Sequence, residues 1–385
     1  MKRNDRLYVD IHVLQTVPPS CINRDDTGSP KTAVYGGVTR LRVSSQSWKR
    51  AARMMMRDET MLDQDDFGSR TKSLAQEIAK ALCSLETSIS TDEAEKLATD
   101  TVNLASGKPI ISVKAAKGKA AKPDVEDAQD EEAKNEALFF VTPRQVLSVA
   151  KLALAWRQEN LKPSKKEVQD ALSLKTGIDI ALFGRMVAQA PELNIDACVQ
   201  VAHGISTHKA ATEYDYFTAV DDLPTNETAG AAHIGTVEFS SATLYRYATV
   251  AVHELRTQLG GIAAAATVEF VRAFVLSMPT GKQNTFANRT LPDALMITVR
   301  NDQPVNLVGA FEQPVTTESG GYAGASVARL TEHAQSLYED FAGDPLLILT
   351  CGKALCAVGE HGSFPDLIDH LTKALEAHMG KGDDE

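Results

Sequence analysis

One stretch, GGVTRLRVSSQSWKRAARMMMR at residues 36–57, limits most strongly what this chain can fold into. Its first part alternates, with Leu41 and Val43 on one face of a predicted strand and Arg40 and Arg42 on the other. Three serines then follow, and any of them can cap a helix start (Ser44, Ser45, Ser47). A strand with two outward arginines that runs into a helix start is the outline of a phosphate site.

The helix predicted after the serines is amphipathic. Apolar side chains recur at helical spacing on one face, at Trp48, Ala51, Ala52 and Met55. The opposite face carries four cations, Lys49, Arg50, Arg53 and Arg57. Like charges three or four residues apart repel by about 0.2–0.5 kcal/mol per pair, so an anion would stabilise this face. An ordinary solvated basic face is the alternative interpretation.

The charge distribution supports a local anion site. The whole chain has a formal net charge of −11, which by itself argues against a nucleic-acid binder. The segment from Arg24 to Arg57 nevertheless carries +6, which leaves −17 on the remainder. Because a local patch selects the partner while the global charge sets solubility, the segment predicts a confined anionic ligand.

Composition also indicates the compartment. The N-terminal residues contain no apolar run of signal-peptide length, and we expect no stretch long enough to span a bilayer. The five cysteines are scattered and odd in number, which fits a reducing cytosol better than a disulfide framework. We therefore expect a cytoplasmic protein that has no membrane partner.

The order of elements predicts an α+β fold. Residues 6–15 alternate as a core strand, and residues 16–37 form a long loop rich in Pro, Gly, Asn and Asp that suits a binding role. Residues 60–176 turn helical, with capping boxes at Thr142 and Ser164. Strand patterns at 195–205 and 236–252 predict a long hairpin-like excursion. Without the two excursions, the order suits a ferredoxin-like antiparallel sheet with helices on one face.

The lysine-rich and then acidic segment 114–137 has almost no large apolar side chain, so we expect a mobile loop there.

Catalytic candidates are sparse. Acids occur at Asp25, Asp26, Asp221 and Asp222, and histidines at His203 and His208. Adjacent aspartates are commonly loop or capping residues, and without a third ligand or an HExxH motif they define no metal site.

Two nucleotide-binding patterns are incomplete. The PTGKQNT segment lacks the GxxxxGK[ST] spacing of a phosphate loop, although Lys282 within it can meet a nucleic-acid backbone. The aromatic RNP1 run that reads bases on a recognition-motif sheet is absent. What remains is backbone binding through cations, helix-start amides and an apolar element that separates bases.

The segment SCINRDDTGSPKTAVYGGVTRLRVSSQSWKRAAR resembles the signature of the CasC-type (Cas-seven family) backbone subunit of the type I-E CRISPR surveillance complex, Cascade. The resemblance continues in the same order through GIDIALFGRM, AHGISTH, DYFTAVDDL, AHIGTVEFSS, LYRYA and GKQNT. It implies an RNA-recognition-motif palm with a helical fingers insertion and a β-hairpin thumb. On this pattern we expect palm at 1–59 and 239–385, fingers at 60–178 and thumb at 179–238.

The resemblance also implies a function without catalysis and without a cofactor. Several copies would form a helical filament along the guide RNA (crRNA), each thumb displacing every sixth nucleotide from pairing with target DNA. The other partners would be the large, small, Cas-five-type and Cas-six-type Cascade subunits. Carried over by motif, the guide-contacting residues would be Arg24, Lys31, Arg42, Ser44, Gln46, Lys49, Arg50, Arg53, Arg185, Met186 as an apolar wedge, His208 and Lys282.

Two features depart from the family pattern as we know it, the segment 114–137 and Trp48 in place of an aliphatic residue. Two other functions stay open at this point. One is a metal-dependent ribonuclease of the kindred type III backbone proteins, with a thumb-proximal aspartate (Asp25, Asp26, Asp221 or Asp222). The other is a metabolic α+β enzyme with a surface basic patch, which predicts no co-purifying RNA.

Overall fold

The computed structural model describes residues 6–60, 62–112, 134–135, 138–219, 233–318, 320–352 and 355–380. The predicted mobile loop 114–137 therefore lies outside the described residues, except for residues 134 and 135. The chain forms two compact units. The sheet unit comprises Met1–Thr60, Val199–Arg256 and Gly261–Glu385, and the helical unit comprises Met61–Cys198 and Thr257–Gly260. The four-segment division expected from the sequence is finer than these two units and stays a prediction.

The sheet unit is built on one ten-stranded sheet whose main path runs β14-β13-β12-β1-β11-β9-β3-β2. Every pairing in it is antiparallel except that of β13 with β14. The strands are β1 (Tyr8–Ser20), β2 (Thr32–Tyr35), β3 (Val38–Val43), β8 (Val199–Val201), β9 (Gly204–Ser206), β10 (Glu213–Ala219), β11 (His233–Ala251), β12 (Ala294–Arg300), β13 (Leu347–Cys351) and β14 (Glu360–His361).

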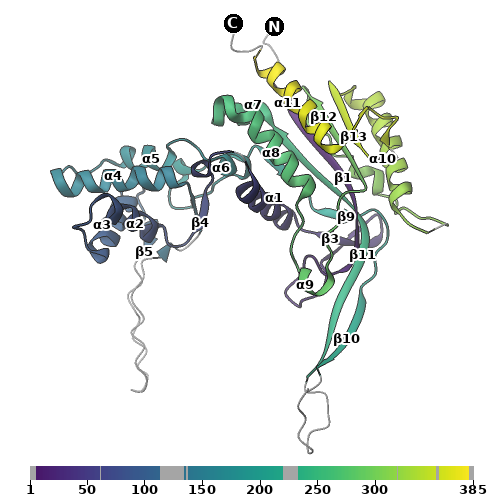
Figure 1. The fold of residues 1–385 in the computed structure, drawn as a ribbon, viewed down its shortest axis with the longest axis horizontal. Coiled ribbons are helices and arrows are strands. Elements are labelled where there is room, and N and C mark those ends of the chain that lie inside the picture. Colours follow the sequence, from purple (N-terminus) through teal and green to yellow (C-terminus); the bar gives the residue numbers. More distant parts are fainter. Residues whose placement is uncertain are drawn as a thin grey trace, which may run out of the picture. The chain divides into compact units, whose positions relative to one another are not determined.

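Helices cover this sheet and connect its strands (Figure 1). They are α1 (Ser45–Glu59), α7 (Val252–Leu259), η3 (Gly260–Ile262), α8 (Ala263–Leu276), α9 (Gln283–Phe286), η4 (Leu307–Phe311), α10 (Ala323–Leu337), the π-helical turn η5 (Tyr338–Ala342) and α11 (Phe364–Gly380). Helix α8 packs against both α1 and α11.

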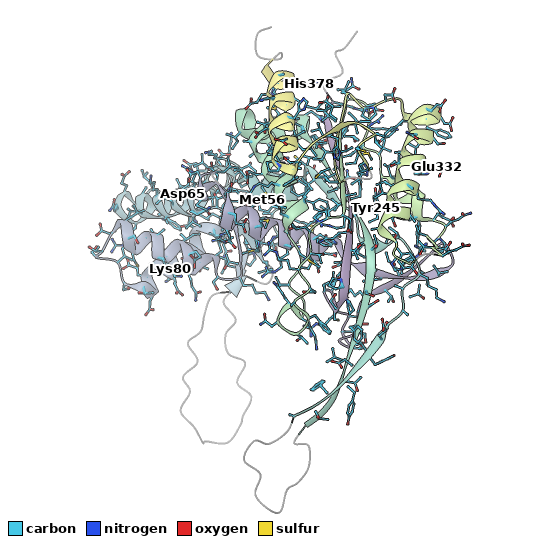
Figure 2. All side chains as sticks on the ribbon, turned by 45° about the vertical axis from the view of Figure 1, so that its right-hand side comes forward. Met56, Asp65, Lys80, Tyr245, Glu332 and His378 are labelled. Carbon is cyan, nitrogen blue, oxygen red and sulfur yellow. The ribbon has the colours of Figure 1, made fainter. Side chains whose placement is uncertain are left out.

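Both faces of the central sheet are buried. Tyr245 of β11, labelled in Figure 2, shares a hydrophobic cluster with Leu330 of α10 and Phe311 of η4. The next residue, Arg246, points to the other face and contacts Phe274 of α8. Strand residues alternate between faces, so α10 and η4 lie opposite α8. The α+β class is confirmed, while the expectation of helices on one face only is wrong.

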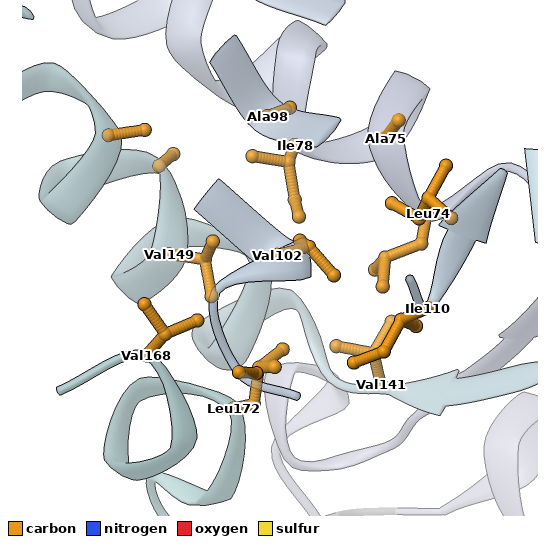
Figure 3. Close-up of a cluster of buried hydrophobic side chains, with 14 of the residues drawn as sticks. Leu74, Ala75, Ile78, Ala98, Val102, Ile110, Val141, Val149, Val168 and Leu172 are labelled. Atoms are coloured by element: carbon orange, nitrogen blue, oxygen red, sulfur yellow. The ribbon is translucent and has the colours of Figure 1, made fainter. Parts of the chain in front are cut away.

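The helical unit contains the predicted helical insertion. Its elements are η1 (Gln64–Asp66), β4 (Ser69–Thr71), α2 (Leu74–Leu85), α3 (Thr91–Asn103), β5 (Ile111–Ser112), β6 (Lys134–Asn135), β7 (Phe139–Val141), α4 (Pro143–Glu159), α5 (Lys165–Ser173), α6 (Ile178–Phe183) and η2 (Pro191–Leu193). Its core joins Leu74 and Ile78 of α2 with Ala98 of α3 and Val149 of α4 (Figure 3). Both capping boxes are confirmed, since Thr142 and Ser164 each accept from the amide three residues on.

One helical stretch, Val252–Leu276, is long and apolar enough to cross a membrane by length and composition alone. The expectation that no stretch reaches this length is therefore wrong. Burial explains the composition, because 56% of the most apolar window of this stretch lies inside the fold. Its second half is α8, whose apolar side chains pack against the sheet and neighbouring helices.

The hairpin predicted between the strand patterns is present. Residues 233–239 of β11 pair with β10, and residues 240–251 of the same strand pair with β1 in the central sheet. Figure 1 shows the β10–β11 ribbon projecting from the sheet, and we call this ribbon the thumb hairpin. Residues 220–232 lie outside the described residues, and the candidate acids Asp221 and Asp222 are among them.

Candidate nucleic-acid interface

The start of α1 is held by side chains from two other segments. The Ser44 N–H donates to Asn23 Oδ1 of the first loop at 2.8 Å, and the Ser45 N–H donates to His203 Nδ1 at 3.2 Å. The Ser44 hydroxyl makes no capping bond and lies 3.1 Å from the Ser47 hydroxyl instead. Two helix-start amides that the sequence offered to a phosphate are thus bonded within the protein.

The buried face of α1 differs from the one expected. Trp48, Ala52 and Met56 face inward, whereas Met55 is half-buried. Trp48 packs on Arg246 of β11, whose guanidinium carbon lies 3.7 Å from the centre of the Trp48 ring. Cation–π contact and shape fix Trp48 there, and the positions four and eight residues later follow it inward.

The cations of α1 are not equally available. Arg50 is exposed and Lys49 is half-buried, in agreement with an outward face. Arg53, by contrast, is only 8% exposed, so its expected position on the solvent face is wrong. Gln46 is exposed at the helix start. The surface that α1 offers to a ligand therefore centres on its first two turns.

A cleft of about 790 Å³ lies beside these turns. The first loop and the segment around Gly281 form its other walls. The residues that line it are Ile22, Asn23, Arg24, Asp25, Asp26, Thr27, Gly28, Ser47, Arg50, Ala51, Met54, Met278, Pro279, Thr280 and Gly281. Arg24 and Arg50, both predicted from the sequence, are exposed on this cleft.

The Gly281 segment fits closely against the first loop. A Cβ added at Gly281 would overlap the Ile22 carbonyl, so glycine is required by the close approach of two backbones. The next residue, Lys282, has a left-handed φ of 46° and begins α9. Burial raises the pKa of the Cys21 thiol, while Arg24 and Lys282 act in the opposite direction. Both cations are therefore near the same sulfur.

The first loop is shaped by Asp25. Its Oδ1 accepts from the Thr27 hydroxyl at 2.7 Å and from the Thr27 and Ser29 amides at 3.0 Å each. The Thr27 hydroxyl is the main reason why the pKa of Asp25 lies below its ordinary value. In the parts of the chain that the structure describes, no group of three or more His, Cys, Asp or Glu residues could hold a metal ion.

A second group of polar side chains lies where β3 leads into α1. Arg42 is half-buried, and its Nε donates to the Thr32 carbonyl at 3.1 Å. Its amide donates to the Lys31 carbonyl, which ties the loop to the strand. Burial, Arg42 and Lys31 together lower the pKa of His203. The structure thus brings Lys31, Arg42 and the exposed His203 together beside the start of α1.

Arg40 is a correction to the sequence analysis, which placed it outward beside Arg42. It is fully buried, and its guanidinium donates to the carbonyls of Tyr35 (3.1 Å), Ser206 (3.0 Å), Phe311 (2.8 Å) and Glu312 (3.2 Å). The segment ending η4 covers the sheet face at Arg40. Burial lowers the pKa of Arg40.

His208 also faces the interior. Its ring stacks on Tyr322 with centroids 3.6 Å apart. Because the Thr243 N–H can only donate, Nε2 accepts that bond at 3.1 Å, and Nδ1 then donates to the Lys209 carbonyl at 2.8 Å. Burial lowers the pKa of His208. Both ring nitrogens are thus engaged in holding the base of the thumb hairpin.

Arg185 and Met186 lie in the helical unit. The Arg185 side chain is buried, and it donates to the carbonyls of Leu193 at 2.9 Å and Leu172 at 3.0 Å. Burial lowers its pKa to about 10. Met186 is 80% exposed. Of these two adjacent residues, only Met186 presents its side chain to a ligand.

Sequence reasoning missed three features of this region. Asn23 carries no motif signal, and its role as a cap for Ser44 depends on tertiary folding. The sequence indicates His203 only as a catalytic candidate, whereas in the structure its ring accepts a hydrogen bond from the Ser45 amide. On the thumb hairpin, Tyr214 is 68% exposed and Tyr216 is 63% exposed on the same strand face, a pattern that alternation in β10 could have indicated.

The comparisons with known proteins agree with this architecture. The model of the CT1975-like protein family matches residues 9–369. The chain belongs to the CT1975-like family. Two similar solved chains come from a "CRISPR RNA-guided surveillance complex, pre-nicking" (36% identity, TM-score 0.80) and a "CRISPR RNA-guided surveillance complex" (30% identity, TM-score 0.73). Each match covers 95% of this chain and 99% of the other.

No curated protein matches this CT1975-like chain. The family and the solved chains together identify a CRISPR-associated protein of the Cas-seven type. They also support the α+β fold with a palm of RNA-recognition-motif type. These matches do not distinguish between types of surveillance complex, so the type I-E assignment expected from the sequence stays a prediction.

Proposed function

We propose that this protein is a guide-RNA-binding backbone subunit of a CRISPR surveillance complex of the type I-E kind. The observation that carries the proposal is the near-complete match in length and fold to chains of RNA-guided surveillance complexes. The cleft beside α1 adds a physical reason, since Arg24 and Arg50 line it together with small and polar residues, while the acids Asp25 and Asp26 lie in the wall formed by the first loop. Such a surface contacts phosphates and reads no sequence.

The proposal also assigns roles to the palm, the thumb hairpin and Met186. The palm binds the backbone of the crRNA, and copies of the chain line up along it through a head-to-tail interface. The thumb hairpin displaces every sixth nucleotide, and the exposed Tyr214 and Tyr216 give a face on which bases can stack. Met186 of the helical unit serves as an apolar wedge. The bound guide then pairs with target DNA, since guided recognition leaves sequence reading to base pairing.

In this proposal the subunit works in the cytoplasm, without catalysis and without a cofactor, beside large, small, Cas-five-type and Cas-six-type partners. The palm takes in residues 1–59 and 239–385, the fingers 60–178 and the thumb 179–238. The Asp25 carboxylate has a structural role in this proposal, because its Oδ1 accepts three hydrogen bonds that shape the first loop.

Binding of single-stranded RNA of guide length by the purified full-length protein, measured across salt concentrations, tests the proposal. We expect affinity to fall as salt rises, because bound phosphates release counterions. Changing Arg50 to alanine should lower affinity for all sequences equally and reduce the slope of log affinity against log salt by about 0.7. Chemical probing would locate the displaced nucleotides at every sixth position in the assembled complex.

Arg57 supplies the matched control. It lies on the same helix two turns after Arg50, carries the same charge and is exposed, but it does not line the cleft. Changing Arg57 to alanine should leave the salt slope unchanged. Equal losses in the two variants would show a diffuse electrostatic effect, and an unchanged Arg50 variant would remove the cleft from the RNA site.

A further inference from the structure

We propose that His203 links the start of α1 to a phosphate of the bound strand. Its Nδ1 accepts a hydrogen bond from a helix-start amide, and its Nε2, in the neutral ring, donates a hydrogen bond to the phosphate. The inference rests on the proposed function and adds a residue to its ligand site. His203 lies in the turn between β8 and β9, more than 150 positions along the chain from the serines it faces. Its side chain is exposed, so a ligand can reach it.

The hydrogen bond to Ser45 fixes which ring nitrogen carries the proton. The Ser45 backbone N–H can only donate, so His203 Nδ1 accepts and is unprotonated. The neutral ring therefore carries its hydrogen on Nε2, on the far side from the helix. Among the residues that the structure describes, none hydrogen-bonds to Nε2. The ring thus accepts a hydrogen bond from a helix-start amide at Nδ1 and offers a hydrogen-bond donor, Nε2–H, on its side away from the helix.

The turn that carries His203 is held on both sides. The Ala202 amide donates to the Tyr247 carbonyl at 2.9 Å. Gly204 pairs with Val43 of β3, and a Cβ at Gly204 would come within 2.9 Å of Trp48 Nε1, so this turn packs directly on α1. The imidazole is thus positioned by two strands and a helix, as a group that orients a ligand requires.

Burial and the surrounding charges both disfavour protonation of the ring. Lys31 from the first loop and Arg42 from β3 both lower the pKa of His203, after burial as the largest cause. The α1 residues next to it, Ser45 and Gln46, are uncharged. Protonation would also place a second hydrogen on Nδ1 against the Ser45 N–H. The same two cations favour an anion beside the ring, so the ligand class is a phosphodiester.

Two conservative variants separate a donor role from a purely structural cap. His203→Asn keeps an acceptor near the position of Nδ1 for Ser45 but has no group that reaches the position of Nε2. His203→Gln places a donor near Nε2 and gives up the close acceptor. We expect His203→Asn to lose about tenfold in affinity for guide-length single-stranded RNA, and His203→Gln to stay within about threefold of wild type.

Salt and pH give the decisive readouts. The loss in His203→Asn should leave the salt slope unchanged because the donor is neutral, whereas Arg42→Ala should lower the slope. Wild-type affinity relative to His203→Gln should stay constant between pH 7.5 and 8.5, a range above the ordinary pKa of histidine, which burial, Arg42 and Lys31 lower further. Normal binding by His203→Asn with weak binding by His203→Gln would overturn the relay and leave a capping role.

A wild-type advantage over His203→Gln that grows as the pH falls from 8.5 to 7.5 would also overturn the proposal, because it would show a cationic histidine. Thermal unfolding of both variants is measured alongside, so that a loss of fold is seen directly. If the folded wild-type protein bound no guide-length RNA at any salt concentration, both the proposed function and this inference would fail. If wild type binds and both variants bind equally well, only the inference fails.

Discussion

Arg40 and Arg42 stand two residues apart on β3 and have opposite environments. The face at Arg40 is covered by Phe311 and Glu312, whose backbone carbonyls accept hydrogen bonds from the Arg40 guanidinium. At Arg42 the cover ends, and among the described residues the guanidinium is bonded only through Nε, to the Thr32 carbonyl. One arginine therefore joins three segments of the fold, while the other remains near the surface for a ligand.

This difference predicts a large contrast in stability. Changing Arg40 to alanine should lower the free energy of unfolding by about 3 kcal/mol, because four carbonyls lose their donor, and the bonds to two of them, Ser206 and Phe311, are buried. Changing Arg42 to alanine should lower it by less than about 1 kcal/mol, since the side chain is half exposed and makes one bond. Urea unfolding of both variants gives the comparison. Equal losses would contradict the assigned role of Arg40.

At the scale of elements, the β2–β3 hairpin positions the strand that leads into α1. Its turn consists of Gly36 and Gly37, with φ values of 57° and 76°. Such two-residue turns suit the twist of antiparallel strands and require residues that tolerate positive φ. Gly36 has a second constraint, because a Cβ there would overlap the Glu312 carbonyl. Gly37 has open space around it.

Alanine at the two positions should therefore have different effects. Gly37→Ala should lower the free energy of unfolding by about 1 kcal/mol, the penalty for an L-residue at positive φ. Gly36→Ala should lower it by about 3 kcal/mol or more, because the backbone at Glu312 must also move away. Denaturant midpoints measure both. A Gly37 variant as damaged as the Gly36 variant would show that φ alone governs this turn.

At the scale of the whole molecule, Asp10 links the central strand β1 to its surroundings. The Tyr247 hydroxyl donates to its Oδ1, and the Val305 amide donates to its Oδ2, each at 2.9 Å. Burial nevertheless dominates and raises the pKa of Asp10 to about 6, from 3.8. The folded protein therefore holds this proton at pH values where the unfolded chain has released it.

Global stability should then depend on pH with a defined sign. Because the folded pKa is the higher one, the contribution of Asp10 to stability is greatest below about pH 4 and declines through pH 6, by about 3 kcal/mol in all. Asp10→Asn cannot titrate, so the stability of wild type relative to this variant should fall by about that amount between pH 3 and pH 7. Urea unfolding at several pH values measures it; a constant difference would contradict the buried carboxyl.

Local patterns in the sequence were sufficient for some of the elements, but they missed β2 within the predicted loop 16–37 and β10. Alternation predicted β1 and β3, helical spacing and capping boxes predicted α4 and α5, and the basic stretch beside a polar loop predicted the region of the cleft. These features depend on residues a few positions apart, which is why they can be read without the fold. Arg24, Arg50 and Met186 are exposed as a ligand site requires.

Only the tertiary structure decided which polar side chains remain available. Arg40, Arg185 and His208 are buried because carbonyls and rings from distant segments surround them. Trp48 of α1 likewise packs on Arg246, which lies more than 190 residues away along the chain. The sequence by itself determined where cations gather, through spacing along the chain. Their exposure depends on which distant backbone covers each face, and local periodicity carries no record of that.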